Sequence, residues 1–351
     1  MTVLHRLFNS IWYQGNPLGW IFWPLSQLFA YLVRHRRRQF LAGRKSAFHP
    51  DVPIIVVGNI SVGGTGKTPM SIWLLEELKR RGMRPGLVSR GYGGIAPYYP
   101  YRVSGTDEAS VTGDEPLMIH LRTGVPVVVD PDRSRAVRHL LEESDVNVII
   151  SDDGLQHYKL SRTVELVIVD GHRGFGNSRL MPMGPLRESL DRLRTVDAVV
   201  INGGLDDSIL NPASLPQSKC FDMTLQPAQW LPLNSQGQTD GQGTWSSNEC
   251  DLPVYALAGI GNPDRFFQTL YQLAIQHQAH PFPDHHEYTE LDLEAFAAGW
   301  VLTTEKDAVK LRKFPSLKGA YLPINAQVQP GLIDVIMARI EDFNRHHRHL
   351  Y

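Results

Sequence analysis

The stretch GNISVGGTGKTPM, from Gly58 to Met70, decides the fold of this 351-residue chain. Its GKT triplet at positions 66–68 ends a phosphate-binding loop, whose usual pattern is G-x-x-x-x-G-K-[ST]. Ser61 occupies the position where that pattern has its first glycine. The β-branched run VPIIVVGNI precedes the loop, and a segment with helical periodicity follows it up to Gly82. A glycine-rich loop between a buried strand and a helix predicts a nucleotide site rather than a simple turn.

The loop residues predict how the phosphates of ATP are bound. Backbone N–H groups at the N-terminus of a helix surround phosphate oxygens. Lys67 is expected to reach the β- and γ-phosphates, and the Thr68 hydroxyl is expected to hold Mg²⁺. The predicted nucleotide-binding residues are Ser61, Val62, Gly63, Gly64, Thr65, Gly66, Lys67 and Thr68.

Two classes of P-loop protein are disfavoured by the sequence. GTPases carry an N-K-x-D motif after a strand, whereas the nearest stretch here is TTEKDAVKL, in which Lys306 and Asp307 are adjacent. Partner-type membrane ATPases carry a second, earlier lysine in the loop, and this loop has Val62 and no such residue.

Short apolar runs recur along the chain and predict its fold class. They are PGLVS, VPVVVD, VNVIIS, VELVIVD and DAVVING, followed by PVYALAG, WVLTT and GAYLPI. Helical segments alternate with these runs, which is typical of βαβ units with parallel sheets. We therefore predict an α/β fold, with a P-loop NTPase-like parallel-sheet domain at 46–222 and a smaller α/β domain at 252–351. The polar stretch within 223–251 is expected to be a linker or exposed loop.

Residues 1–45 predict a membrane-associated helix followed by a basic cluster. Residues 1–50 hold seven Lys/Arg and no Asp or Glu, and the cluster from Arg34 to Arg38 follows an apolar run of 16 residues that starts at Leu18. A membrane span needs about 20 apolar residues, so we expect an anchor lying in the plane of an anionic membrane surface. The alternative is a buried core helix followed by a solvated basic turn. Aromatic side chains suited to the membrane interface are Trp12, Trp20 and Trp23.

The overall composition excludes several other classes of protein. The formal net charge is -1, from 35 basic and 36 acidic side chains, so no nucleic-acid partner is indicated. Cys220 and Cys250 form no disulfide framework, which suits a reducing cytosol. The spacing of histidines and cysteines matches no transition-metal motif. No signal-peptide cleavage pattern follows the N-terminal apolar segment, so we expect that segment to be retained.

Polar residues that follow the predicted strands are candidate site residues. Asp152 and Asp153 come directly after VNVIIS, where P-loop enzymes place the carboxylate that holds Mg²⁺. Arg90 begins SRGYGG, whose glycines allow close approach to an anion. Asp114 lies in TGDEPLM at a loop or helix start, and His285 lies in FPDHHEYT. A helix cap for the carboxylates and an idle surface histidine are the alternative interpretations.

Taken together, these motifs resemble the tetraacyldisaccharide 4'-kinase family of lipid A biosynthesis. The resemblance extends in order across nearly the whole chain. It rests on VVGNISVGGTGKTP, SRGYGG, GDEP, DPDRSRA, SDDGLQH, GFGNSRLMPMGPLRE, GIGNPDRFF, FPDHHEYT and TTEKDAVKL. The serine at position 61 belongs to that family's loop, so the resemblance implies a variant phosphate loop rather than a decayed one.

The resemblance implies transfer of the γ-phosphate of ATP, with Mg²⁺, to the 4'-hydroxyl of a tetraacylated glucosamine disaccharide 1-phosphate. The product is the 4'-phosphorylated lipid A precursor. The lipid resides in the cytoplasmic leaflet of the inner membrane, which implies a membrane-associated protein with its catalytic domains in the cytoplasm. No obligate protein partner is inferred.

The resemblance also assigns roles to residues. It implies that Asp114 accepts the hydroxyl proton, with His285 as its hydrogen-bonded partner and Lys67 as the catalytic phosphate contact. The remaining implied roles are substrate binding by Arg90, Arg133 and Asp153, and Mg²⁺ binding by Thr68 and Asp152. The sequence does not distinguish the role of Asp152 from that of Asp153. If His285 lies in the smaller domain and Asp114 in the larger one, domain closure is expected to assemble the pair.

Two other functions remain alternatives at this point. One is a different P-loop small-molecule kinase or ATP-dependent ligase, which would not need residues 1–38. The other is a peripheral membrane ATPase that acts as a partner-regulated switch without a lipid substrate.

Overall fold

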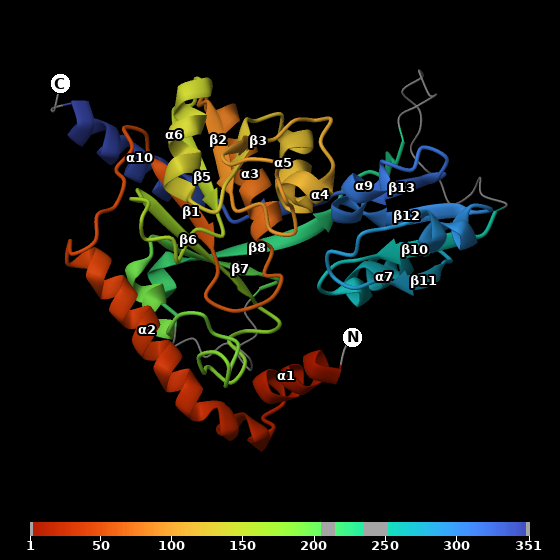
Figure 1. Ribbon diagram of the computed structural model, residues 1–351, viewed down its shortest axis with the longest axis horizontal. Coiled ribbons are helices and arrows are strands. Elements are labelled where there is room, and N and C mark those ends of the chain that lie inside the picture. Colours follow the sequence, from red (N-terminus) through yellow and green to blue (C-terminus); the bar gives the residue numbers. More distant parts are fainter. Residues whose placement is uncertain (1–2, 205–214, 235–251, 349–351) are drawn as a thin grey trace. The chain divides into compact units, whose positions relative to one another are not determined.

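The computed structural model describes residues 3–204, 215–234 and 252–348, which form two compact units (Figure 1). The first unit comprises Met1–Arg90, Val125–Leu225 and Ala326–Tyr351. The second comprises Gly91–Gly124 and Gln226–Asn325.

This division differs from the expected boundaries in two segments. Residues 91–124 belong to the second unit although they precede most of the P-loop domain's strands, and residues 326–351 return to the first unit. The cause for 91–124 is packing, since helix α5 (Asp114–Thr123) lies against α9 (Glu305–Leu311). Most of the expected linker, residues 235–251, lies outside the described residues, as does Cys250.

The first unit is built on a parallel sheet whose central order is β8-β7-β6-β1-β5-β2-β4. On β1, Ile55 pairs with Ile150 of β5 on one side and Val164 of β6 on the other. All five residues of β1 are buried, as expected for a strand covered on both faces. The bounds are β1 (Ile54–Gly58), β2 (Pro85–Ser89), β4 (Val127–Val129), β5 (Val148–Asp152), β6 (Val164–Asp170), β7 (Ala198–Asn202) and β8 (Cys220–Pro227).

This sheet confirms the parallel α/β fold and sets the position of the phosphate loop. After β1 the chain continues to β2 on one side, and β6 then pairs with β1 on the other side. The loop after β1 therefore lies where the strand order changes direction, which is where doubly wound sheets bind ligands.

The helices of the first unit that follow its N-terminal region are α3 (Lys67–Arg80), α6 (Arg133–Glu143) and α10 (Leu332–Arg348), with 3-10 turns η2 (Leu190–Thr195) and η4 (Gln217–Lys219).

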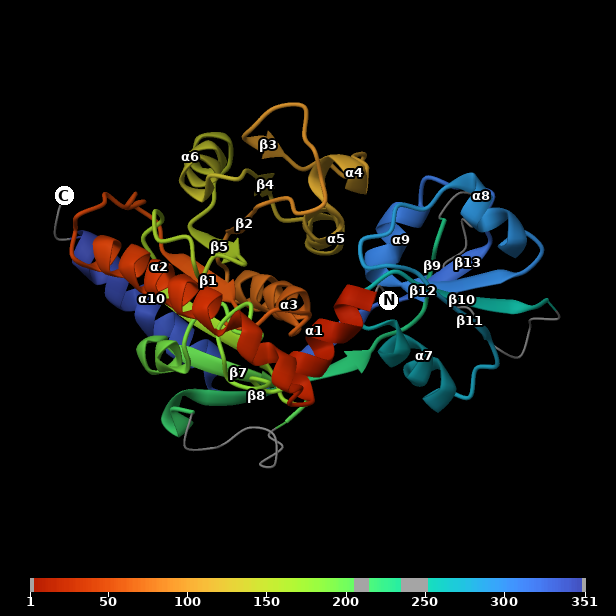
Figure 2. The ribbon, with the colours of Figure 1, turned by 60° about the horizontal axis from the view of Figure 1, so that its bottom comes forward.

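The N-terminal region consists of three helical pieces instead of the one helix expected. They are α1 (Val3–Tyr13), the 3-10 helix η1 (Pro17–Phe22) and α2 (Trp23–Leu41), drawn in red to orange in Figures 1 and 2. The break has a local cause: prolines stand in the first turns of both η1 and α2. Within the described residues, no helix has the length and apolar character required to cross a membrane.

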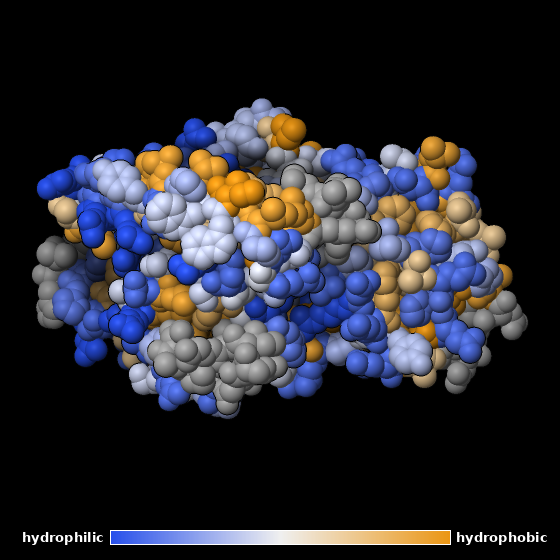
Figure 3. All heavy atoms as spheres, turned by 90° about the horizontal axis from the view of Figure 1, so that it is seen from below, coloured by the Kyte–Doolittle hydropathy of each residue, from blue (hydrophilic) through white to orange (hydrophobic). Residues whose placement is uncertain are grey.

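The apolar stripe of α2 faces outward. Ser26 and Ala30, one turn apart, form its buried side, and the Ser26 hydroxyl donates to the Leu180 carbonyl at 2.8 Å. Leu25, Leu28 and Leu32 are each more than half exposed, at 56%, 55% and 54%. Figure 3 shows apolar side chains gathered over η1 and α2. This pattern is the reverse of a core helix, so the interpretation as a buried helix is wrong.

The second unit has its own parallel sheet, in the order β11-β10-β12-β13-β9, with only β9 antiparallel. Its strands are β9 (Leu231–Pro232), β10 (Val254–Ala258), β11 (Gln278–Pro281), β12 (Trp300–Thr304) and β13 (Gly319–Leu322). The further elements are β3 (Tyr101–Arg102), α4 (Ala109–Thr112), α5, α7 (Pro263–Gln272), α8 (Glu290–Leu293), η6 (Glu294–Phe296) and α9, and β14 (Ile324–Val328) leads back to the first unit.

Candidate active site

The phosphate loop connects β1 to α3, as predicted. Gly66 caps α3 in a left-handed conformation, with φ of 95°. A Cβ atom on Gly66 would lie 2.7 Å from the side-chain nitrogen of Asn202, and that nitrogen donates to the Thr65 carbonyl at 3.1 Å. Both the backbone conformation and the lack of space therefore require glycine at this position.

The structure explains why a serine is compatible with position 61. Ser61 forms a bridge with Leu186, and the neighbouring Val62 N–H donates to the Pro185 carbonyl at 2.9 Å. Residue 61 is thus part of a short antiparallel pairing and has no left-handed backbone. The backbone conformation at residue 61 therefore does not require glycine.

Lys67 begins α3 and contacts a carboxylate of the β5 carboxyl end. Its Nζ lies 3.7 Å from Asp153 Oδ1, and Arg187 lies 3.1 Å from Asp153 Oδ2. Burial raises the pKa of Asp153, but Lys67 and Arg187 outweigh it and hold this pKa below its usual range. Asp153 has φ of 46°, which is uncommon for a residue with a side chain. The arrangement keeps a carboxylate charged beside the phosphate loop.

Asp152 is the last residue of β5 and is buried, with 3% exposure. The Ser71 hydroxyl lies 3.5 Å from its Oδ1 atom. Thr68 lies in the first turn of α3, one residue after Lys67. Carboxylate and hydroxyl oxygens are the ligand types that Mg²⁺ prefers.

Buried polar atoms around the loop fit a bound phosphate group and its ion. Thr65 Oγ1, Asn59 Oδ1 and Asn202 Oδ1 are buried and have no hydrogen-bond partner among the described residues. Buried polar atoms of this kind usually mark a ligand, ion or ordered water. Together with the exposed Gly63 and Gly64 of the same loop, they match an oxygen-rich anion with a hard cation.

The two arginines expected at the substrate have different environments. Arg90 is exposed at the end of β2. Arg133 is buried, and its guanidinium donates to the carbonyls of Asp130 at 2.9 Å and Asp152 at 3.2 Å. Burial lowers the pKa of Arg133 to about 10. Arg133 therefore supports the carboxyl ends of two strands of the sheet.

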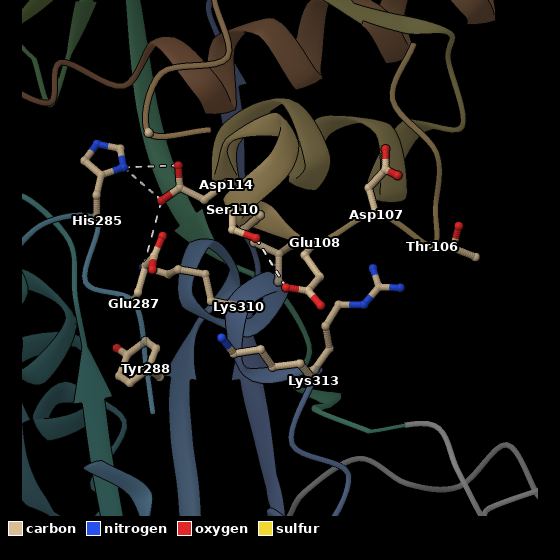
Figure 4. Close-up of a pocket in the computed structure, with 14 residues that line it drawn as sticks. Thr106, Asp107, Glu108, Ser110, Asp114, His285, Glu287, Tyr288, Lys310 and Lys313 are labelled. Atoms are coloured by element: carbon tan, nitrogen blue, oxygen red, sulfur yellow. Dashed lines mark hydrogen bonds and ion pairs between the residues drawn. The ribbon is translucent and has the colours of Figure 1, made fainter. Parts of the chain in front are cut away.

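A second group of candidate residues lies wholly within the second unit (Figure 4). Asp114 is the first residue of α5 and is 4% exposed. His285 Nδ1 lies 3.0 Å from Asp114 Oδ2 and 3.2 Å from Oδ1. His285 has φ of 59°, and its ring contacts Tyr92 edge-on at 5.1 Å between centroids. The expected hydrogen bond between the two residues is thus present.

The charge environment keeps Asp114 ionised. Burial raises its pKa, but the His285 hydrogen bond and Lys306 outweigh burial and leave the pKa of Asp114 below its usual value. The hydrogen bond to Asp114 in turn raises the pKa of His285. Lys306 and Lys310 approach Asp114 Oδ2 to 3.8 and 3.9 Å. A carboxylate held in this way is an acceptor for a proton from a hydroxyl group.

Asp114 and His285 line a cavity of about 270 Å³. The other residues labelled in Figure 4 come from the segment before α4, from α4, from the segment after His285, from α9 and from the turn just after α9. They include Ser110, Glu287 and Lys313. The cavity wall carries several hydrogen-bonding groups, and the largely buried Asp114 forms part of that wall.

The glycines near Asp114 serve close packing of backbone. A Cβ atom on Gly94 would lie 2.3 Å from the Gly113 nitrogen, and one on Gly113 would lie 2.7 Å from the Tyr92 carbonyl oxygen. The sequence interpretation, in which the SRGYGG glycines approach an anion, is not needed to explain Gly94. These contacts set the position where α5 begins.

The condition for domain closure is not met in the structure. The sequence interpretation expected closure to assemble Asp114 and His285 if the two residues lay in different domains. Both lie in the second unit and are already hydrogen-bonded there. The pair therefore forms through packing within one unit.

A family model described as tetraacyldisaccharide-1-P 4'-kinase matches residues 18–341. The chain belongs to this family. The tetraacyldisaccharide 4'-kinase of Pseudomonas paraeruginosa is 44% identical over 341 residues, which cover 97% of this chain and 98% of that protein. The one of Vibrio parahaemolyticus is 44% identical over 343 residues, covering 96% and 97%. A crystal structure of LpxK from Aquifex aeolicus in complex with ATP is 27% identical, with a TM-score of 0.75, and covers 92% of this chain and 99% of that chain.

Membership of the tetraacyldisaccharide 4'-kinase family makes the chain a kinase, with ATP and Mg²⁺ as the implied cofactors. The sequence interpretation did not identify Lys306, Lys310, Arg173 or Asn202 as site residues. For the two lysines, the signal was their four-residue spacing in TTEKDAVKL, which puts both on one face of α9. Arg173 Nη1 lies 3.4 Å from the position of a Cβ atom on Gly63, and no sequence signal linked them.

Proposed function

We propose that this kinase transfers the γ-phosphate of ATP to the 4'-hydroxyl of a tetraacyldisaccharide 1-phosphate, which yields the 4'-phosphorylated precursor of lipid A. The observation that carries the proposal is the buried Asp114 carboxylate, hydrogen-bonded to His285 at 3.0 Å and open to a polar cavity. The match to the tetraacyldisaccharide-1-P 4'-kinase family over residues 18–341 supports the choice of substrate.

Asp114 is the proposed general base. A sugar hydroxyl is a weak nucleophile at neutral pH, and its proton must leave as its oxygen bonds to phosphorus. In the proposed step the 4'-oxygen forms a bond to the γ-phosphorus, the bond from that phosphorus to the bridging oxygen breaks, and ADP leaves. The hydroxyl proton passes to Asp114. His285 donates its Nδ1–H to the carboxylate and orients it.

The phosphate loop is the proposed ATP site. Backbone N–H groups of 63–66 and the Lys67 ammonium bind the phosphates, in line with the exposed Gly63 and Gly64 of the loop. Thr68 and Asp152 are the proposed Mg²⁺ residues, and the bound ion would neutralise charge on the phosphates. Ser61 and Val62 hold the loop in place through their pairing with residues 185–186.

The substrate roles proposed for Arg90, Arg133 and Asp153 rest on their positions at the strand ends. Arg90 is exposed and suits direct contact with an anionic group. Arg133 donates to two carbonyls, so we assign it to holding the turn at Asp152 and Asp153. Asp153 positions Lys67 through their ion pair.

The proposed location is the cytoplasmic face of the inner membrane. The outward apolar stripe of η1 and α2 would enter the lipid interface, with the basic residues 34–38 beside lipid phosphates. Trp20 and Trp23, 60% and 47% exposed, fit the headgroup region. The protein would then reach a lipid substrate while it stays at the membrane surface.

The test is incubation of the purified protein with Mg-ATP labelled in the γ-phosphate and a tetraacyldisaccharide 1-phosphate in detergent micelles. Label on the lipid that is lost in Asp114→Asn supports both the substrate and the base. Label on the lipid that persists in this variant contradicts the role of Asp114. ATP turnover without labelled lipid contradicts the substrate and supports the switch-ATPase alternative.

A further inference from the structure

Lys306 lies at the centre of the polar contacts around the Asp114–His285 pair. Its Nζ lies 3.3 Å from His285 Nε2, 3.2 Å from Glu115 Oε1 and 3.3 Å from Asp284 Oδ1. The side chain is only 16% exposed. The His285 ring is therefore held between a carboxylate at Nδ1 and an ammonium at Nε2.

This arrangement decides where the proton of the neutral ring lies. A lysine ammonium has three donors and no acceptor, whereas a neutral imidazole has one nitrogen of each kind. Burial lowers the pKa of Lys306, but Glu115 and Asp114 outweigh burial and raise this pKa above its ordinary value, so Lys306 stays charged. Nε2 must then accept from Lys306, which leaves the N–H on Nδ1, opposite Asp114.

The same contact opposes a second proton on the ring. A proton on Nε2 would place two donors and two positive charges against each other at 3.3 Å. Asp114 favours a second proton, as does Asp284 Oδ1 at 3.9 Å from Nε2. Lys310 lies near Asp114, and the Tyr92 ring contacts His285 edge-on. Among the residues that the structure describes, only Lys306 brings a cation directly to the ring.

We propose that Lys306 is a positioning residue that keeps the single proton of His285 on Nδ1 and opposes its second protonation. The inference rests on the proposed role of Asp114 as base. A doubly protonated ring would bind the carboxylate as an ion pair and make it a poorer proton acceptor. A neutral ring with Nδ1–H orients Asp114 and leaves its basicity higher.

The first test measures the ring directly. ¹⁵N NMR of protein labelled at histidine distinguishes an Nδ1–H ring, an Nε2–H ring and a doubly protonated ring, with His285 assigned by its loss in His285→Gln. In the wild-type protein the neutral ring should carry its proton on Nδ1. In Lys306→Met, the pH at which His285 takes up its second proton should rise by about one unit, since a neighbouring charge is removed. Lys306→Arg should restore the wild-type value.

A matched control is Lys318→Met, which removes an exposed lysine of the same unit. It should leave the His285 titration unchanged. A neutral wild-type ring with its proton on Nε2 would overturn the inference. An unchanged titration of His285 in a Lys306→Met variant whose thermal melt shows a folded protein would also overturn the inference.

The second test separates this inference from the proposed function. The acid limb of the kcat/KM profile for the lipid should move to higher pH in Lys306→Met, so activity near pH 6 falls about tenfold but recovers at higher pH. A loss that is equal at every pH contradicts the inference. If the NMR result holds and Asp114→Asn keeps full activity, the proton position stands and the proposed base is wrong.

Discussion

Asp114 and His285 are 171 residues apart in the chain, and their side chains are hydrogen-bonded at 3.0 Å in the same compact unit. His285 lies in the loop that follows β11, and α5 presents Asp114 at its first turn. Asp114, the proposed base, is therefore positioned by the packing of α5 on α9.

Replacing Asp114 by asparagine should remove most activity while leaving ATP binding intact. Asparagine keeps the shape but cannot accept the hydroxyl proton, so kcat for the lipid should fall by about 10²- to 10⁴-fold. The phosphate loop lies in the other unit, so the dissociation constant for ATP should stay close to the wild-type value. Asp264→Asn, an exposed carboxylate change, is the control. Retention of more than a tenth of kcat in Asp114→Asn would contradict the assignment.

Gly66→Ala and Gly64→Ala should differ sharply in ATP affinity. A Cβ atom on Gly66 would lie 2.7 Å from the Asn202 side chain, and the backbone there has a φ of 95°. In contrast, nothing lies within 4 Å of the position of a Cβ atom on Gly64. We expect the ATP dissociation constant to rise at least about tenfold more in Gly66→Ala, because strain of this kind costs about 1–3 kcal/mol. Calorimetric titration with Mg-ATP measures both. Equal affinities would show that the loop tolerates a β-carbon at either position.

The Asp114–His285 pair should stabilise the fold only within a window of pH. The pKa of Asp114 is lower in the folded protein than its unfolded value of about 3.9, so the pair stabilises the fold at pH values above about 3.9. This stabilisation is lost as the pH falls through the folded pKa of Asp114. The pKa of His285 is higher in the folded protein than its unfolded value of about 6.5, so the pair stabilises the fold fully at pH values below about 6.5. This stabilisation is lost as the pH rises through the folded pKa of His285. The loss of Tm in His285→Gln should therefore be largest between about pH 4.5 and 6.5.

Thermal melts of the wild type, His285→Gln and the exposed-site control His49→Gln across this range test the window. A difference in Tm that does not change with pH would mean that His285 contributes through packing alone.

Removing the outward stripe of α2 should weaken membrane binding without unfolding the protein. Leu25 and Leu28 are more than half exposed, so replacing both by serine should change Tm little. Each leucine that enters lipid contributes about 1.5–3 kcal/mol, so the double variant should bind anionic vesicles at least about tenfold more weakly. Co-sedimentation with vesicles measures this. Leu291→Ser, at a 78% exposed site of the second unit, should bind like the wild type.

The features that the sequence predicts well are local ones. The phosphate loop and the strand runs are continuous patterns, and they lie where predicted, with Asp152 at the end of β5. The grouping of 91–124 with the second unit was not predictable, because only the packing of α5 on α9 reveals it. Lys306 was missed because its spacing from Lys310 indicates only a shared helix face, whereas its partners Glu115 and Asp284 are remote in sequence. The apolar run that starts at Leu18 predicted a helix, but it did not predict that Ser26 would lie on the buried side of α2.

The chain crosses between the two units four times, and this order constrains how the protein can be made. The unit with the phosphate loop receives α10, which packs near β6, only after all of the second unit has been synthesised. A ribosome-bound chain that ends before residue 326 thus lacks part of the unit that carries the phosphate loop. Each unit is made of separated chain segments, so a single break in the chain isolates neither unit. A recombinant between two relatives therefore keeps each core intact only if all segments of a unit come from the same parent.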